Sequence, residues 1–288
     1  MAMNSRTVLN VALVLAVVVL AAVVYFQPGL KEASVGKLLT TIDPRQVKEL
    51  HLSNEQGEVV LRRDGEEWNL QAPLTIVANK FRVEQLLHWF VVSSVQSYAA
   101  AGLDLAKFGL DQPQATVSAN GVELRFGNLD PLNQRRYLLL NNTVHLVAES
   151  DLTAPTSPWN YFVSPLVVPQ GVQIKALAIP GLGEIALGEK GWRYSGKIPP
   201  ASADAMQMLA DSWRNARALS VEPVAMSDAH EQVVISFADD RPPLKLALIR
   251  SHDDLVLVAD NIGIEYHMGV EQGSALLKWL EPGKVGAK

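Results

Sequence analysis

The 288-residue sequence contains no cysteine. The chain therefore has no disulfide, no thiolate nucleophile and no thiolate metal ligand, and a lipid anchor attached to cysteine is excluded. The absence of cysteine fits an extracytoplasmic compartment without establishing it, because many cytosolic proteins also lack this residue.

Common catalytic and metal-binding motifs are also missing. The six histidines are scattered singly, without an H-x-x-x-H or H-E-x-x-H pair, and no G-x-S-x-G elbow occurs. Residues 227–231 (SDAHE) and 252–254 (HDD) contain suitable residue types, but neighbours within one turn point apart. We expect no catalytic residue, no cofactor, no metal and no enzymatic activity. A hydrolase whose groups converge only in the folded chain stays as an alternative.

Strong positive charge is lacking as well. The chain carries 25 basic and 30 acidic residues, a net charge of −5, and no basic cluster. This balance argues against nucleic-acid binding and against tight binding to anionic lipid headgroups. With 48% hydrophobic residues, the chain is expected to fold and to bury a core.

What the sequence does contain is an apolar segment near its start. Residues 8–26 are apolar apart from Asn10 and the hydroxyl of Tyr25, and about 19 residues in a helix span roughly the 30 Å of a bilayer core. Pro28 and Gly29 would end this helix. A transmembrane helix is predicted, with a cleaved signal or a buried core helix as alternatives. Its membrane-spanning residues would include Val8, Val11, Leu13, Leu15, Val18, Leu20, Val24, Tyr25 and Phe26.

The flanking charges favour one orientation of this segment. Arg6 precedes it without an acidic neighbour, whereas Lys31 and Lys37 follow it together with Glu32. The small positive bias places the N-terminus in the cytoplasm. We therefore expect a protein of the bacterial inner membrane with its body in the periplasm, in contact with the bilayer and with other envelope membrane proteins.

Beyond residue 45 the same order of elements occurs twice. In the first copy, strand-like runs around Leu50–Leu52 and Trp68 precede an amphipathic helix over 83–91, for which Asn79 is the expected cap. The clearest hairpin signal follows, at Asn120–Gly121.

The second copy repeats these elements about 122 to 124 residues later. Strand-like runs at 174–179 and around Trp192 precede an amphipathic helix over 205–216, with Ser202 as its cap, and hairpins follow over 233–268. We predict an α+β fold: an N-terminal transmembrane helix followed by two similar repeats, each of antiparallel strands and hairpins with one amphipathic helix. The predicted domains are 1–27 (cytoplasmic tip and transmembrane helix), 28–45 (connector), 46–169 (first repeat) and 170–288 (second repeat).

A family resemblance rests on three sequence features. They are the run Phe108–Pro113 (FGLDQP), the strand ending at Phe126–Gly127, and Arg136–Tyr137 opening the next strand. With Trp68 and the following helix, this arrangement resembles the bacterial family catalogued as domain of unknown function 4340. The resemblance implies an N-terminally anchored, extracytoplasmic protein, and some members are similar to accessory components of gliding-motility-type ABC transporters. It supplies no catalytic residues.

Two stretches are candidate partner surfaces. The loop 127–136 is either an exposed connector or a partner-docking loop, and the segment 159–163 either packs between the domains or forms a hot-spot patch. The candidate residues are Leu129, Leu132, Arg135, Arg136, Trp159, Tyr161 and Phe162.

These features favour a non-enzymatic scaffold, accessory or regulatory subunit of a cell-envelope assembly, with an ABC-type transport system as one candidate. The alternative is a periplasmic ligand-binding module that holds a lipid or glycan between its repeats. This alternative predicts a cavity of several hundred Å³ lined from both domains.

Overall fold

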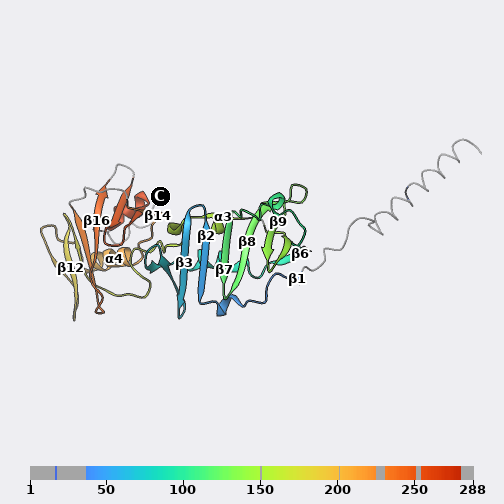
Figure 1. The fold of residues 1–288 in the computed structure, drawn as a ribbon. Helices are drawn as coiled ribbons and strands as arrows, with labels where there is room; N and C mark the ends of the chain where they lie inside the picture. Colours follow the sequence, from blue (N-terminus) through green and yellow to red (C-terminus); the bar gives the residue numbers. More distant parts are fainter. Residues whose placement is uncertain are drawn as a thin grey trace, which may run out of the picture.

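The protein forms an elongated body of two antiparallel β-sheets placed side by side (Figure 1). The computed structural model describes Val17 and residues 37–149, 151–200, 202–224, 231–250 and 254–279. The first sheet has ten strands and the second has eight. All strands of the first sheet lie before residue 148 and all strands of the second lie after residue 173. The domain boundary expected at 169/170 falls between them and stays a prediction.

The first sheet has the strand order β1-β6-β10-β9-β8-β7-β2-β3-β4-β5. Its strands are β1 (Lys37–Leu38), β2 (Glu49–Asn54), β3 (Gly57–Asp64), β4 (Glu67–Ala72), β5 (Ile76–Val77), β6 (Ser93–Ala99), β7 (Ala115–Ala119), β8 (Val122–Leu129), β9 (Arg136–Leu140) and β10 (Thr143–Val147). The helices η1 (Pro44–Gln46), α2 (Lys80–His88) and η2 (Leu105–Phe108) join them.

The second sheet has the order β13-β12-β11-β15-β16-β17-β18-β14. Its strands are β11 (Ile174–Ile179), β12 (Gly183–Gly188), β13 (Gly191–Ser195), β14 (Ser220–Pro223), β15 (Gln232–Phe237), β16 (Leu244–Arg250), β17 (Leu255–Ala259) and β18 (Ile264–Met268). It carries α4 (Ala203–Arg214) and α5 (Val270–Leu276), and the segment between the sheets contains α3 (Thr153–Thr156) and η3 (Trp159–Phe162).

Eight strands follow the same order in both sheets. The run β6-β10-β9-β8-β7-β2-β3-β4 corresponds strand for strand to β14-β18-β17-β16-β15-β11-β12-β13, and α2 and α4 occupy the same place along the chain. The first sheet adds β1 and β5, one at each edge. The repeated unit is therefore an antiparallel sheet of eight strands. Counted along the chain, its helix lies between the third and fourth of these shared strands.

The predicted α+β class is wrong, because the described chain is built mainly from antiparallel strands. Its longest helix, α4, has 12 residues. The prediction gave too much weight to two clear helical periodicities, while most of the chain around them alternates with a period of two. No transmembrane helix is seen either: within the described ranges no helix is long and apolar enough to cross a membrane. Apart from Val17, the segment 8–26 lies outside the described residues.

Local sequence explains how the strands pair. In the β7–β8 hairpin, Asn120 and Gly121 both have positive φ (49° and 78°), which suits a two-residue turn that matches the twist of the strands. Val117 and Leu124, opposite one another in this hairpin, are fully buried. Most of the large buried side chains, Trp68 and Trp213 among them, belong to one hydrophobic cluster that draws on both sheets.

Candidate ligand-binding groove

A groove of about 790 Å³ lies where the two sheets meet. Its walls come from three parts of the chain: the end of the first sheet with the start of α2, the segment 164–171, and the strand ends and turns of the second sheet. The lining residues on which the description below depends are Glu66, Glu67, Trp68, Lys80, Phe81, Leu166, Arg217, Phe237, Arg241 and Tyr266. The volume lies within the range of small-molecule sites, roughly 300–1,000 Å³.

The segment 163–167 links the two sheets through its backbone. On the first-sheet side, the amide of Ser164 donates to the carbonyl of Val77 at 2.9 Å. On the second-sheet side, Val167 donates to Ala216 at 3.0 Å, and Ala218 donates back to Pro165 at 2.8 Å. These bonds hold the connecting segment against both sheets, so it supports the groove as a fixed part of the fold.

The first-sheet wall of the groove is aromatic. Trp68 on β4 is only 1% exposed, and its indole Nε1 has no hydrogen-bond partner among the described residues. The Arg63 guanidinium lies over this ring, 4.9 Å from its centroid. Phe81, on the first turn of α2, is 67% exposed. An apolar ring this exposed at the rim of a groove is suited to contact a bound apolar molecule.

The second-sheet wall combines an aromatic pair with fixed charges. Tyr266 on β18 is almost completely buried, and this burial raises the pKa of its phenol to about 12, so the hydroxyl stays neutral well above physiological pH. Arg241 lies over the Phe237 ring, 5.5 Å from its centroid, and its guanidinium is 2.8 Å from an Asp239 carboxylate oxygen. This wall offers apolar surface and a neutral hydroxyl.

The charged groups around the groove nearly balance. Lys80, Arg217 and Arg241 line it together with Glu66 and Glu67, and Lys80 Nζ lies 3.9 Å from Glu66 Oε2. A balanced rim does not select strongly for a charged ligand. Apolar contact is therefore the main attraction that this groove provides.

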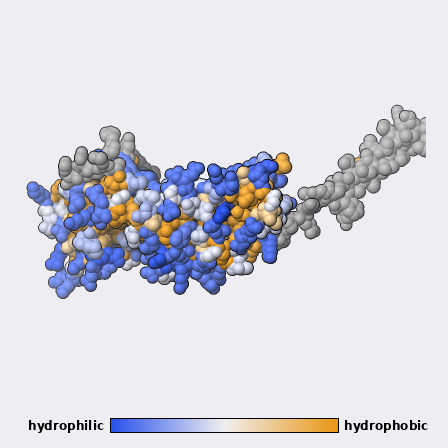
Figure 2. Space-filling view, viewed as in Figure 1, coloured by the Kyte–Doolittle hydropathy of each residue, from blue (hydrophilic) through white to orange (hydrophobic). Residues whose placement is uncertain are grey.

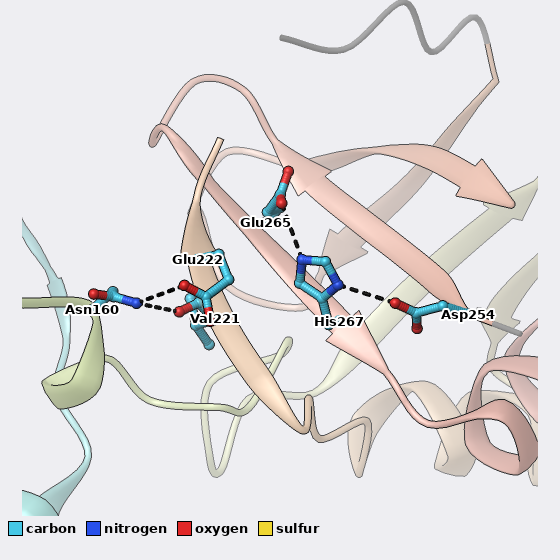
Figure 3. A network of polar contacts seen from close by, with 6 residues as sticks. All are labelled: Asn160, Val221, Glu222, Asp254, Glu265 and His267. Atoms are coloured by element: carbon cyan, nitrogen blue, oxygen red, sulfur yellow. Dashed lines mark hydrogen bonds and ion pairs between the residues drawn. The ribbon is translucent and has the colours of Figure 1, made fainter. Parts of the chain in front are cut away.

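Polar side chains gather around β14 and β18 of the second sheet, together with Asp254, which directly precedes β17, and Asn160 on η3 (Figure 3). His267 stands between two carboxylates, with Nδ1 3.0 Å from Asp254 Oδ2 and Nε2 3.0 Å from Glu265 Oε1. Burial alone would lower the pKa of His267, but the two hydrogen-bonded carboxylates outweigh burial and raise it. Glu265 also lies opposite Glu222 in the β14–β18 register. A protonated His267 would therefore offset charge repulsion at this edge.

This network does not form a metal site. Among the residues that the structure describes, no group of three or more His, Asp and Glu side chains has the geometry to hold a metal ion. The triad-like run 227–231 lies mostly outside the described residues, as do His252 and Asp253.

The loop 127–136 is an ordered turn with one exposed apolar residue. The amide of Asp130 donates to the carbonyl of Arg135 at 2.7 Å, and Asn133 donates from its backbone and side chain to Asp130 Oδ2. Leu132 is 88% exposed, whereas Leu129 is half-buried. Arg136 is 6% exposed and donates from Nη1 to the carbonyl of Gly127, so it belongs to the interior.

The segment 159–162 lies against both sheets. Tyr161 packs under the Arg82 guanidinium, 4.2 Å from ring centroid to Cζ, and its hydroxyl donates to Gln85 on α2. Asn160 donates from Nδ2 to the Val221 carbonyl on β14 (Figure 3). Phe162 is fully buried and Trp159 is partly buried. The segment therefore contacts both the α2 region of the first half and β14 of the second sheet.

Several residues of the family resemblance pack together in a small cluster on the first sheet, apart from the main core. The ring centroids of Phe108 and Tyr137 are 4.8 Å apart, and a Cβ on Gly127 would stand 2.3 Å from the Phe108 carbonyl oxygen. Leu110 is fully buried in a small hydrophobic cluster there. Figure 2 shows hydrophobic residues gathered over β8 and β9 in this region. The shared sequence features are therefore packing features.

These observations define a β-rich protein of two matching antiparallel sheets with a groove between them. A family model described as Domain of unknown function (DUF4340) matches residues 68–228, which is more than half of the chain. The chain belongs to this family. The matched region begins at Trp68 in the first sheet and continues past β14 in the second. No curated protein and no solved structure matches the chain.

Proposed function

We propose that this protein is a non-enzymatic accessory component of a bacterial cell-envelope assembly that works by binding an apolar or amphipathic ligand of the lipid class in the groove between its sheets. The observation that supports this most directly is the groove itself, about 790 Å³ in volume and lined from both halves. A protein that served only as a scaffold would have no need of a hollow between its sheets.

The lining favours a lipid over a glycan. Phe81, Leu166 and Phe237 offer apolar surface, and four of the lining residues are prolines, which lack an amide donor. A glycan needs a dense set of hydrogen-bonding groups, because its buried hydroxyls are costly to leave unpaired. An acyl chain needs only apolar surface and gains about 0.8 kcal/mol for each CH₂ removed from water.

The test measures bound lipid directly. The full chain is purified in mild detergent, and organic extracts are analysed by mass spectrometry; binding of a dansylated fatty acid to the same protein is then titrated. L166R, which places a long cation in the groove, should reduce the retained lipid and the probe affinity at least tenfold. L132R is the matched control, since it makes the same change at an exposed residue outside the groove. Absence of any retained lipid together with equal probe binding by the two variants would contradict the proposal.

A second candidate function, docking of an envelope protein partner, is favoured by Leu132. This apolar side chain is held out at 88% exposure by the hydrogen bonds of Asp130. In a crosslinked pulldown from membranes, L132D should lose a protein that L166R retains. Recovery of the same proteins with both variants would remove support for this surface.

The proposed location, with the body in the periplasm, rests on the apolar segment 8–26 and the charges that flank it. Protease added to spheroplasts should degrade the body. If the body is degraded only after lysis, the location is wrong.

A further inference from the structure

The charged residues that line the groove are divided between its two walls. Glu66 and Glu67 belong to the end of the first sheet, with Lys80 on the same side. Arg217 and Arg241 belong to the second-sheet side. The rim is therefore nearly balanced in sum, but it is acidic toward one sheet and basic toward the other. Such a rim adds little net attraction for a charged ligand, yet it can orient a ligand whose charge lies at one end.

Arg217 is a cation of the groove without a carboxylate partner among the described residues. Arg241 is held by Asp239, whose two carboxylate oxygens each lie 2.9 Å from its Nε. Lys80 Nζ lies 3.9 Å from Glu66 Oε2. Within the described part of the chain, the exposed Arg217 side chain forms neither an ion pair nor a hydrogen bond. Its N–H donors are therefore available to an anionic group in the groove.

The segment between the sheets fixes the position of Arg217. An isolated antiparallel bridge pairs Arg217 with Leu166, and backbone hydrogen bonds of 2.8 and 3.0 Å flank this bridge. Residues directly opposite one another in such a pair point to the same side, with their Cβ atoms about 4.5–5.5 Å apart. Because both residues line the groove, the Arg217 side chain faces it beside the apolar Leu166.

The same segment gives the groove a direction. Val163 pairs with Ala78 at the first-sheet end of the segment, and Leu166 pairs with Arg217 at the second-sheet end. At about 3.3 Å per extended residue, the two bridges are at most roughly 10 Å apart along the segment. Phe81, which is 67% exposed, lines the groove close in sequence to Ala78. A ligand lying along this segment would meet an apolar ring at one end and a cation at the other.

We propose that the groove binds a lipid with an anionic head, which pairs with the Arg217 guanidinium while the acyl chain lies along Leu166 toward Phe81. This inference rests on the lipid binding proposed above and names the chemistry of the head. Carboxylate and phosphate oxygens match the planar donors of a guanidinium, and a neutral head would leave them unused. The reverse orientation would place the anion beside Glu66 and Glu67, where like charges repel.

The test compares two probes of equal chain length in the full-length protein. One is a fatty acid dansylated at the end of its chain away from the carboxyl group, and the other is its methyl ester. At a pH at which the carboxyl group is ionised, the parent should bind the acid about three- to fivefold more tightly than the ester, since an exposed ion pair is weak. R217Q should bind the ester as the parent does and show no preference for the acid, whereas R217K should keep part of the preference.

R214Q is the matched control for this change. It removes the same charge at the end of α4, from a residue that does not line the groove, and should leave the preference for the acid unchanged. Loss of the preference in both R217Q and R214Q would assign it to net charge and overturn the role of Arg217. Loss of ester binding in R217Q would also overturn it, because the side chain would then act by supporting the apolar wall.

The remaining outcomes separate this inference from the lipid binding on which it rests. Equal binding of acid and ester by the parent would refute an anionic head and leave lipid binding intact. Displacement of the acid by inorganic phosphate, beyond the effect of chloride at the same ionic strength, would show that Arg217 holds a free anion instead of a lipid head. If the parent binds neither probe, the proposed lipid function fails and this inference fails with it.

Discussion

Asn160 donates a hydrogen bond from Nδ2 to the main-chain carbonyl of Val221, 2.9 Å away on the edge strand β14. The same amide lies 3.0 Å from Glu222 Oε2. The Asn160 side chain thus donates to two acceptors on β14, the main-chain carbonyl of Val221 and the carboxylate of Glu222. This contact also joins the segment between the sheets to the second sheet.

We expect N160A to destabilise the protein by about 1–2 kcal/mol, because a partly buried acceptor loses its donor. N160D should cost more at neutral pH, since its carboxylate would face the Glu222 carboxylate. Urea denaturation followed by tryptophan fluorescence measures both effects. N69A is the control, because the Asn69 side chain makes no hydrogen bond with a described residue; equal losses for N69A and N160A would contradict the assignment.

The stability of the second sheet should depend on the protonation of His267. Because its folded-state pKa is raised, the stabilisation is complete below the unfolded pKa, near 6.5, and is lost as pH rises through the folded pKa. The effect should be at most about 1 kcal/mol, since the pair is partly solvated. Urea midpoints measured from pH 5.5 to 8.5 should fall with pH in the parent more than in H267Q. A D254N/E265Q variant should lose the same pH-dependent part of the stability. If the urea midpoint falls with pH as steeply in both variants as in the parent, the role of His267 is refuted.

Gly127 should tolerate no side chain. A Cβ there would stand 2.3 Å from the Phe108 carbonyl oxygen and 2.9 Å from Leu110 Cδ2, so β8 or the Phe108 loop must shift. We expect G127A to lower the free energy of unfolding by about 1–3 kcal/mol, the usual cost of overpacking. G269A is the matched control, because its Cβ would meet no atom closer than 3.5 Å. Thermal melts of G127A and G269A measure this difference. Similar melting temperatures for the two variants would contradict the prediction, because they would mean that the Phe108 loop moves aside at no cost.

The two predicted helix caps, Ser202 and Asn79, should contribute differently to the free energy of unfolding. Ser202 Oγ accepts a hydrogen bond from the Ala205 amide at 3.2 Å, whereas the Asn79 side chain makes no capping bond to α2. S202A should therefore cost about 1 kcal/mol and N79A clearly less. Denaturant titrations of both variants test this difference, and a larger loss for N79A would show that the caps are assigned the wrong way round.

Local patterns in the sequence predicted individual elements well. The period-two runs on either side of Asn120–Gly121 became β7 and β8, and the helical spacing around Leu86 and Leu209 became α2 and α4. Hairpins and amphipathic helices depend on neighbours in the sequence, so one-dimensional patterns suffice to find them. The overall class was wrong because the number of strands that join one sheet depends on long-range pairing.

The groove residues could not be found in the same way. Ile76, Leu166 and Phe237 are ordinary apolar residues that converge only when the two sheets meet. A weak signal was present in the prolines, since Pro165 and Pro169 in the connecting segment and Pro242 and Pro243 between β15 and β16 all line the groove. The ligand-binding alternative predicted a cavity lined from both repeats, which is where the groove lies, but it did not predict which residues line it.

The shielding of β14 by η3 bears on how the protein can be divided for study. A fragment that begins at residue 170 would leave behind Asn160, and the Val221 carbonyl on the outer edge of β14 would lose its hydrogen-bond donor. Such an edge invites intermolecular strand pairing. The smallest autonomous unit of the second sheet therefore starts upstream of Trp159, inside what the repeat pattern assigns to the first half.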